Sequence, residues 1–200
     1  MKIVVIGATG TIGKAVADAL AGGHEVVRVS RKGPVQADLE DAGSLERLFA
    51  SVKDLDAVVC CAGSAAFKPL AKLEDADLAM SLRSKLMGQV NLVRVATRHL
   101  RDGGSITLTS GVLAREPMPG GAAISLVNAG LEAFAGAAAL ELPRRLRVNV
   151  VSPPWITETL VALKMDPKAG IPAAACAKAY VAAVEGSMSG ATLDARAHAR

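Results

Sequence analysis

Aromatic residues are scarce in this 200-residue sequence, which has three phenylalanines, one tryptophan and one tyrosine. Side chains on which nucleic-acid bases could stack are therefore few. Charge is not concentrated either: a net charge of +4 comes from 23 basic and 19 acidic residues, and the densest basic cluster is Arg144, Arg145 and Arg147. A solvated helix end explains that cluster better than a nucleic-acid patch. We expect no nucleic-acid partner.

Cysteines and long apolar runs are also few. The three cysteines, of which Cys60 and Cys61 are adjacent, form neither a disulfide framework nor a paired CxxC metal site. We therefore expect no metal and a reducing, cytoplasmic location. The start MKIVVIGATG is too short for a signal sequence, and no run of about 18 apolar residues occurs, so we expect a soluble protein without a membrane partner.

Short β-branched runs alternate with longer helical patterns, which is typical of parallel β-α-β units covered on both faces. We expect strands at 2–7, 25–30, 35–38, 55–63, 105–110, 147–152 and 190–195, and helices at 11–21, 45–52, 74–100, 120–142 and 172–185. These elements predict one α/β domain over residues 1–200. Its sheet is expected to be Rossmann-like, doubly wound, seven-stranded and mostly parallel, with helices on both faces.

The segment GATGTIG (7–13) directly follows the first expected strand and opens the first expected helix. Glycines at 7, 10 and 13 allow the backbone to approach a pyrophosphate, and the free N–H groups of the helix start face its charge. The alternative is an ordinary strand-to-helix turn, but the order of strand, turn and helix favours nucleotide binding. We therefore expect cofactor contacts from Gly7, Thr9, Gly10, Thr11, Ile12 and Gly13.

The residues after the second strand indicate which dinucleotide binds. An acidic residue there accepts hydrogen bonds from a ribose 2′-OH, whereas a basic one meets a 2′-phosphate. Here the chain has Ser30, Arg31 and Lys32, with no carboxylate before Asp38. Arginine offers a bidentate fork to phosphate and serine a hydroxyl donor, so NADP(H) is favoured over NAD(H). Alternatively, Arg31 and Lys32 only solvate a tight loop.

Several motifs resemble those of the short-chain dehydrogenase/reductase superfamily, along nearly the whole chain. GATGTIG is similar to its cofactor glycine motif, Asp38-Leu39 to its adenine-contacting dipeptide, and CCAG (60–63) to its NNAG turn. TLTSG (107–111) is similar to the strand with the catalytic serine, and RVNVVSPPW (147–155) to the stretch beside the nicotinamide. The resemblance implies further cofactor contacts from Asp38, Leu39, Cys61, Ala62, Gly63, Pro153 and Ile156.

The catalytic positions depart from the family pattern. Working members use a tyrosine to pass the substrate proton, a lysine four residues later, a serine that orients the carbonyl, and an asparagine that holds a relay water. Ser110 matches the serine, but Ile124 stands in the tyrosine position, Asn128 in the lysine position and Lys85 in the asparagine position. The one tyrosine, Tyr180, is followed four residues later by valine, so no YxxxK exists. This combination resembles the Lin1944-like subgroup, which keeps the nucleotide motif without the usual active-site residues.

Two functions from different classes fit this pattern. One is an NADP(H)-dependent oxidoreductase that moves hydride to or from a small carbonyl, imine or enone by a non-standard proton path, with Ser110, Lys85 and Asn128 as catalytic residues. Imines and activated alkenes fit better than simple ketones because they need no strong protein acid. The other is a non-catalytic NADP(H)-binding sensor, or the inactive partner of an active subunit. Lys85 also fits a surface lysine on an amphipathic helix, and Ser110 a hydroxyl that caps a loop.

The resemblance also implies an assembly and a lid. In relatives of this fold two long helices, here 74–100 and 120–142, pack against their copies, which implies a homodimer or homotetramer. The alanine-rich stretch 135–140 permits such close approach, although the same alanines also suit packing on the sheet. Residues 153–171 occupy the place of the substrate lid and suit a modest apolar ligand.

Overall fold

The computed structural model describes residues 1–199, and its seven strands form one sheet in the order β3-β2-β1-β4-β5-β6-β7. The strands are β1 (Lys2–Ile6), β2 (Glu25–Ser30), β3 (Val35–Gln36), β4 (Leu55–Cys60), β5 (Leu100–Thr109), β6 (Arg147–Ser152) and β7 (Thr192–Asp194). The α-helices are α1 (Thr11–Ala21), α2 (Ala42–Ser51), α3 (Asp75–Ser81), α4 (Gly88–Ala96), α5 (Ala122–Ala138), α6 (Thr157–Ala162) and α7 (Ala173–Glu185). All neighbouring strands are parallel. The predicted Rossmann-like α/β fold is confirmed, and its sheet is parallel throughout.

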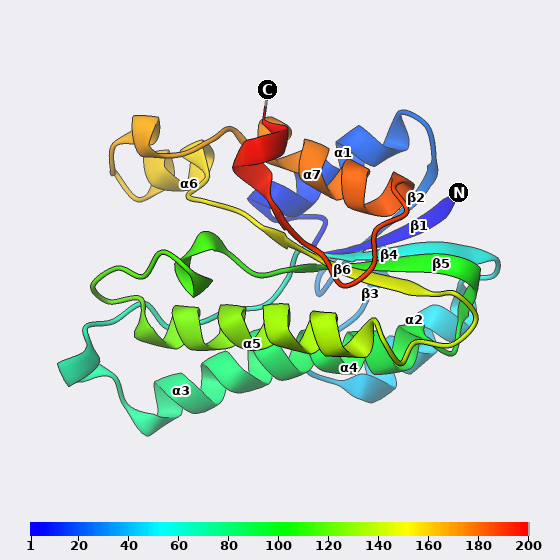
Figure 1. Cartoon of the computed structure of the whole chain (residues 1–200), viewed down its shortest axis with the longest axis horizontal. Helices are drawn as coiled ribbons and strands as arrows, with labels where there is room; N and C mark the ends of the chain where they lie inside the picture. Colours follow the sequence, from blue (N-terminus) through cyan, green and yellow to red (C-terminus); the bar gives the residue numbers. More distant parts are fainter. Residues whose placement is uncertain (200) are drawn as a thin grey trace.

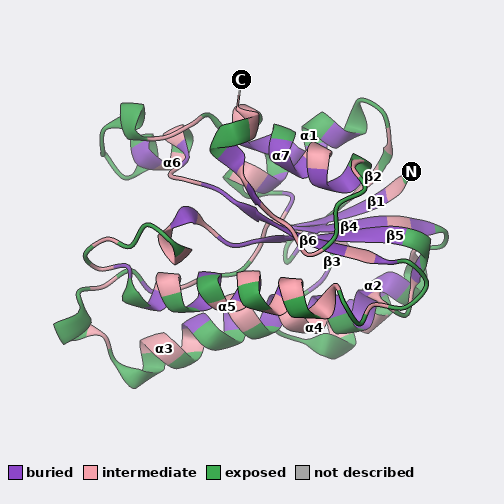
Figure 2. Ribbon diagram, viewed as in Figure 1, coloured by how far each residue is buried: buried purple, intermediate pink, exposed green. Residues whose placement is uncertain are grey.

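Helices cover both faces of the sheet, with α1 and α7 on one face and α2, α4 and α5 on the other (Figure 1). Side chains alternate along a strand, and β4 divides its residues accordingly: Ala57 and Val59 join the core under α1 and α7, whereas Val58 and Cys60 join the core under the opposite helices. The central strands β1, β4 and β6 are almost wholly buried between the helical layers (Figure 2). This is why the sequence shows continuous apolar runs in the strands rather than alternation.

The helix expected over 74–100 is interrupted and shorter. α3 passes into a π-helical turn, Leu82–Met87, and α4 then ends at Ala96. Leu100 is buried and pairs with Leu55, so β5 begins there and not at residue 105. Gly103 and Gly104 lie inside the irregular first part of this strand. Glycine tolerates the backbone conformations that such an irregularity requires.

The carboxyl ends of β1, β4, β5 and β6 lie along one edge of the sheet. The chain runs from β1 outward to β3 on one side, and from β4 to β7 on the other, so the topology reverses between β1 and β4. Ligands of open parallel sheets bind in the crevice at that reversal. Within residues 1–199, no helix combines the length and the apolar character that crossing a bilayer requires.

Candidate active site

Two adjoining clefts open at this edge. The first, which we call the glycine-turn cleft, has a volume of about 480 Å³ and lies among the β1–α1 turn, the ends of β2 and β3, and the turn after β4. The second, which we call the Lys85 cleft, has a volume of about 220 Å³ and lies among the end of β5, α5 and the segment after β6. They adjoin at the π-helical turn, where Ser84 lines the first cleft and Lys85 the second.

Close backbone packing shapes the glycine turn. Gly7 has a φ of +83°, and a Cβ at this position would lie 2.8 Å from the carbonyl oxygen of Cys61. A Cβ at Gly13 would lie only 2.1 Å from the carbonyl oxygen of Gly7. No side chain caps the start of α1, and its first turn contains no acidic residue. The N–H groups of this turn have no intrahelical acceptor, so the helix presents free donors and a positive dipole end to an anion.

The rim of the glycine-turn cleft carries both charges. Ser30 and Arg31 line it at the end of β2, and Glu40 lines it after β3. Arg83 Nε donates to Glu40 Oε2 at 2.8 Å, and this hydrogen bond is the main cause of the lowered pKa of Glu40. Within residues 1–199, Arg31 has no carboxylate at ion-pair distance, although its charge also contributes to the lowered pKa of Glu40. Its guanidinium is therefore available to meet a ligand anion.

Lys85 lies in the π-helical turn with its side chain directed into the second cleft. A Cβ at Gly63 would lie 2.9 Å from the Cα of Lys85, so the backbone after β4 packs directly on this turn. Lys85 Nζ donates to the backbone carbonyl oxygen of Ser110 at 3.1 Å. Desolvation by burial lowers the pKa of Lys85 to about 8, so the ammonium and amine forms interconvert near neutral pH. Lys85 is therefore not a plain surface lysine.

Ser110, the last residue before the turn after β5, has a partner that the sequence did not indicate. Its Oγ donates to Glu132 Oε1 at 2.8 Å, while a second acceptor, the carbonyl oxygen of Val151, lies at 3.5 Å. Glu132 projects from α5 four residues after Asn128, which places both on one face of the helix. Arg115 Nε lies 3.9 Å from the other oxygen, Glu132 Oε2. The serine hydroxyl is thus held against a carboxylate rather than capping a loop.

Asn128 and Tyr180 have very different positions. Asn128 is buried on the wall of the Lys85 cleft, where its Nδ2 donates to Gly111 O at 3.4 Å and its Oδ1 has no hydrogen-bond partner among residues 1–199. Tyr180 lies in the core on α7, where its hydroxyl is 2.8 Å from Thr109 Oγ1 and burial raises its pKa. The one tyrosine is therefore not placed as an acid in the cleft.

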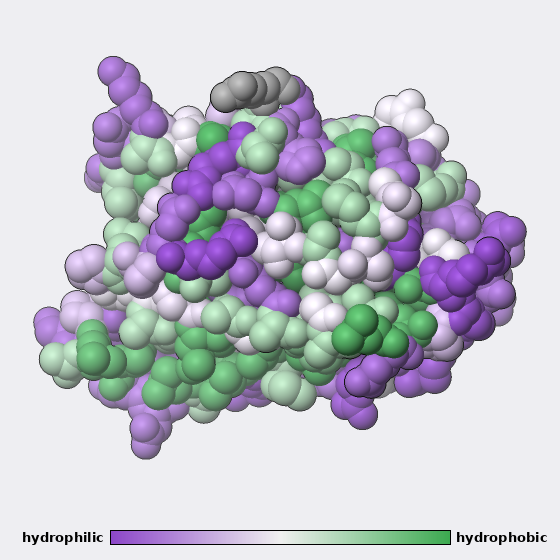
Figure 3. Space-filling view, viewed as in Figure 1, coloured by the Kyte–Doolittle hydropathy of each residue, from purple (hydrophilic) through white to green (hydrophobic). Residues whose placement is uncertain are grey.

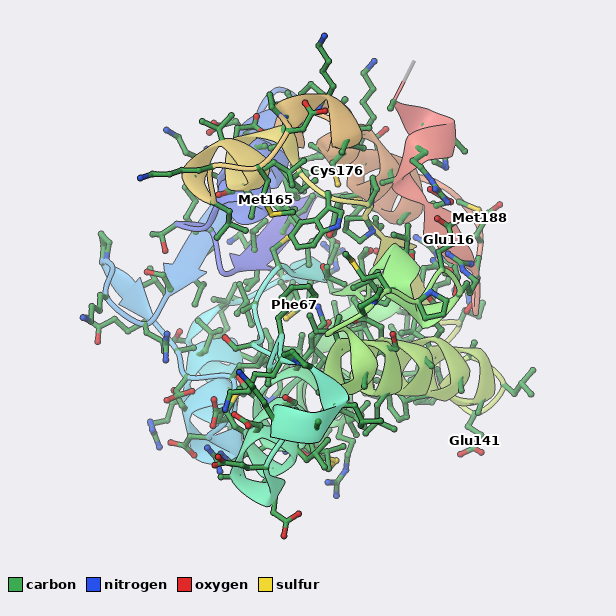
Figure 4. The ribbon with its side chains drawn as sticks, turned by 90° about the vertical axis from the view of Figure 1, so that its left-hand side faces the viewer. Phe67, Glu116, Glu141, Met165, Cys176 and Met188 are labelled. Carbon is green, nitrogen blue, oxygen red and sulfur yellow. The ribbon has the colours of Figure 1, made fainter. Side chains whose placement is uncertain are left out.

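Apolar groups form the rest of the Lys85 cleft. Ile124 lines it from α5, and Val112, Pro154 and Trp155 close other sides. The rings of Trp155 and Phe67 meet edge to face with centroids 6.1 Å apart. In Figure 4 Phe67 and Met165, which follows α6, lie on the same side of the molecule. The predicted lid segment therefore contacts the loop after β4 across the mouth of the site.

The cysteines beside the clefts are thiols rather than thiolates at neutral pH. Burial raises the pKa of Cys60 to about 11 and also raises the pKa of Cys61 well above its usual value. Protonated, buried thiols are poor nucleophiles. Lys85, Ser110 and Thr159 are thus the groups of the Lys85 cleft that can hydrogen-bond or charge-stabilise a reacting oxygen, with Asn128 as an acceptor.

Comparison with known proteins identifies the family. The family model described as enoyl-(acyl carrier protein) reductase matches residues 4–184. The chain belongs to the short-chain dehydrogenase/reductase superfamily. The crystal structure of the protein lin1944 from Listeria innocua is 37% identical, with a TM-score of 0.93 over 97% of this chain and 98% of that one.

Other members of the superfamily are similar over much of the chain. A small-chain dehydrogenase solved in complex with NADPH is 28% identical, with a TM-score of 0.86 over 100% of this chain and 98% of the other. An uncharacterised oxidoreductase of Methylorubrum extorquens is 32% identical in an alignment of 178 positions that covers 76% of this chain and 72% of that protein. The superfamily assignment made from the sequence motifs is confirmed.

Most of the site residues predicted from the sequence line one of the two clefts. The glycine-turn cleft is lined by Gly7, Thr9, Gly10, Ser30, Arg31, Asp38, Leu39, Cys61, Ala62 and Gly63, and the Lys85 cleft by Ile12, Lys85, Ser110, Asn128, Pro153 and Ile156. Thr11 and Gly13 line neither, because Thr11 faces solvent and Gly13 packs beneath Gly7. The sequence analysis did not identify Glu40 and Glu132 as site residues. For Glu132, the available signal was its spacing of four residues from Asn128.

Proposed function

We propose that this chain is an NADP(H)-dependent oxidoreductase that moves hydride to or from a small carbonyl, imine or enone. One observation carries the proposal: a cleft with free helix N–H groups adjoins a smaller, mainly apolar cleft in which Lys85 Nζ lies 3.1 Å from the carbonyl oxygen of Ser110. A dinucleotide spanning both clefts would have its phosphates at the glycine turn and its reactive ring beside these side chains. Binding of NADPH by a relative supports the choice of coenzyme.

The residues present fit this coenzyme. The glycine turn leaves room for a diphosphate, and Arg31 with Ser30 offers donors to a 2′-phosphate. The buried, unpaired Oδ1 of Asn128 suits a ribose hydroxyl donor, which would satisfy an acceptor that is otherwise costly to bury. When bound, the nicotinamide supplies or accepts the hydride. The side chains of this protein would bind the substrate and stabilise the charge that develops on it.

Lys85 would act on the charge that develops at the substrate oxygen or nitrogen. Its ammonium, desolvated beside the end of β5, stabilises an anion more strongly there than in water. The apolar wall and the volume of about 220 Å³ favour a small, mainly apolar substrate. A substrate that needs little acid assistance, such as an imine or an activated alkene, suits a site with Ile124 on its wall and Tyr180 in the core.

A second candidate is a protein that binds NADP(H) without turnover. The observation in its favour is Ile124, which lines the Lys85 cleft without any proton-transfer group. A general acid is commonly worth about 10²–10⁴ in rate, so losing the usual one is a large change. A sensor and an enzyme nevertheless make different predictions for Lys85, because binding of the coenzyme alone does not require a desolvated ammonium.

The test has two steps. NADPH and NADH are first titrated by fluorescence, and NADPH turnover is then followed with a panel of carbonyl, imine and enone compounds. Saturable NADPH binding with turnover that falls in Lys85→Ala and Ser110→Ala supports the oxidoreductase. Saturable binding with no turnover on any panel member supports the sensor. Absence of any binding at millimolar coenzyme would overturn both candidates.

We also propose that the protein assembles as a homodimer or homotetramer. Apolar side chains gather over α3 and α5 in the space-filling view (Figure 3). Leu82 and Met87 of the π-helical turn and Leu126 of α5 are exposed apolar residues. Exposed apolar patches of this kind commonly mark interfaces. Light scattering measures the mass in solution, and a monomer at all concentrations would contradict the assembly.

A further inference from the structure

The proposed hydride transfer leaves one partly buried charged group of the site without a role, the carboxylate of Glu132. Its side chain is only 14% exposed, yet one oxygen accepts the hydroxyl of Ser110 at 2.8 Å. The superfamily pattern assigned from the sequence gives this position no function. A carboxylate next to a serine hydroxyl that lines an apolar cleft is the arrangement of a general base behind a proton-carrying hydroxyl.

The second oxygen of Glu132 faces Arg115. Arg115 Nε lies 3.9 Å from it, which is too far for a hydrogen bond, and the Arg115 side chain is 47% exposed. Solvent around the Arg115 side chain is therefore the route by which water would exchange a proton with this oxygen. The path from Ser110 Oγ to Glu132 Oε1, and from Glu132 Oε2 to that solvent, would link the cleft with the surface.

We propose that Ser110 and Glu132 form the proton path of this site, with Glu132 as the base when an alcohol is oxidised. This rests on the proposed oxidoreductase function. The path replaces the missing tyrosine by a hydroxyl on β5 and a carboxylate on α5, two elements that the sheet already holds together. It also explains why Ser110 donates to Glu132 and leaves its oxygen free to accept a proton from a substrate in the Lys85 cleft.

The atoms balance as follows. Ser110 Oγ accepts the substrate hydroxyl proton while its own proton moves to Glu132 Oε1, so the serine stays neutral. The C–H electron pair leaves the substrate carbon as hydride for the oxidised nicotinamide, and the C–O single bond becomes a C=O double bond. Glu132 then releases its proton to water beside Arg115. In the reverse direction, a protonated Glu132 supplies the proton to the substrate through Ser110.

Activity measurements on four variants test the path, with alcohol oxidation by NADP⁺ as the assay. We expect Glu132→Gln, which keeps the shape, to lower kcat by about 10²–10⁴ without changing coenzyme affinity. Glu132→Ala should be equally slow and partly rescued by millimolar formate, a small carboxylate, whereas Ser110→Ala should not be rescued. Glu141→Gln is the matched control because Glu141 is an exposed glutamate beyond the end of α5 (Figure 4).

A readout without coenzyme complements the kinetics. The ¹³C chemical shift of the Glu132 carboxyl carbon, assigned with Glu132→Gln, should move in Ser110→Ala because the hydrogen bond is lost. Wild-type kcat in Glu132→Gln, no formate rescue of Glu132→Ala, or an unmoved carboxyl shift would overturn the path alone. A wild-type protein that binds NADPH but turns over no substrate would overturn the proposed function, and the path with it.

Discussion

The glycine-turn cleft and the Lys85 cleft share one edge of one sheet, yet they are built from different parts of the chain. Backbone groups dominate the first: tight glycines, an uncapped helix start and the turn after β4. Side chains dominate the second, and they come from the π-helical turn, β5, α5 and the segment after β6. A cleft lined by backbone tolerates changes of side chain, whereas the side chains that line the neighbouring cleft can be replaced without altering the sheet.

The two clefts also treat charge differently. Arg31 stands at the solvated rim of the first, where its cation costs little to maintain. Lys85 is desolvated in the second, and its pKa falls to about 8 as a result. An exposed cation contributes affinity for a phosphate, while a desolvated one acts strongly on a neighbouring reacting atom. The variants below are therefore expected to separate folding, rate and affinity.

The largest effect is expected from Gly13→Ala. Its Cβ would lie 2.1 Å from Gly7 O, and both groups are fixed in backbone, so α1 must move away from β1. We expect a loss of about 3 kcal/mol or more in the free energy of unfolding, and loss of NADPH binding. Urea unfolding and fluorescence titration measure the two effects. Gly23→Ala is the control because nothing lies within 4 Å of a Cβ there, and equal behaviour of the two variants would contradict a backbone-built cleft.

Lys85→Met should lower the rate without weakening coenzyme binding. Loss of the desolvated ammonium is expected to lower kcat for carbonyl reduction by about 10²–10⁴. Because the cation is lost as pH rises through about 8, wild-type reduction should slow above that pH. Lys85→Arg, whose charge does not titrate there, should lose this decline. A wild-type pH profile that stays flat to pH 9 would remove Lys85 from the reaction.

The same lysine predicts a dependence of stability on pH. Between about pH 8 and 10.5, Lys85 binds fewer protons in the folded state than in the unfolded state, so the free energy of unfolding rises with pH. Relative to Lys85→Met, the wild type should gain up to about 3 kcal/mol over this range. Urea titrations of both proteins at about pH 8 and at about pH 10.5 measure the gain. If the difference in the free energy of unfolding between the wild type and Lys85→Met were the same at both pH values, Lys85 would be solvated in the folded protein.

The fold and the glycine-turn cleft were predictable because local patterns determine them. Parallel strands buried on both faces give continuous apolar runs, and the glycines of 7–13 are required by contacts within one β-α unit. The break between α3 and α4 was not predictable, because the residues of the π-helical turn continue a helical pattern. Its position follows from the packing of Gly63 on Lys85, which are far apart in the sequence.

The partners in the Lys85 cleft were harder to predict. Sequence reasoning named Ser110, Lys85 and Asn128 from their positions in the family pattern, but the partner of each depends on which rotamers meet across β5 and α5. Glu132 looked like an ordinary polar residue on a helix, and its bond to Ser110 joins positions 22 residues apart. Glu40 was missed for a similar reason, since Arg83, its partner, comes from the π-helical turn.

Arg31→Ala tests the glycine-turn cleft at its rim. Removing a charged hydrogen bond to phosphate costs about 1.5–3 kcal/mol, so NADPH should bind about 10–100-fold more weakly while NADH changes little. Lys32→Ala is the matched control because it removes the same charge one residue further along. Fluorescence titration gives both affinities. Equal weakening of NADPH and NADH by Arg31→Ala would show that the guanidinium does not meet a 2′-phosphate.

The smallest effect is expected from Phe67→Ala, at the mouth of the Lys85 cleft. Edge-to-face aromatic pairs contribute about 0.5–1.5 kcal/mol beyond burial, so losing the contact with Trp155 should raise KM for the substrate about 2–10-fold. The affinity for NADPH should not change, because neither ring lines the glycine-turn cleft. Leu70→Ala is the control since Leu70 is 75% exposed in the same loop region. If Phe67→Ala weakened NADPH binding and left KM unchanged, the aromatic pair would support coenzyme binding rather than substrate binding. The assignment of coenzyme phosphates to one cleft and substrate to the other would then be contradicted.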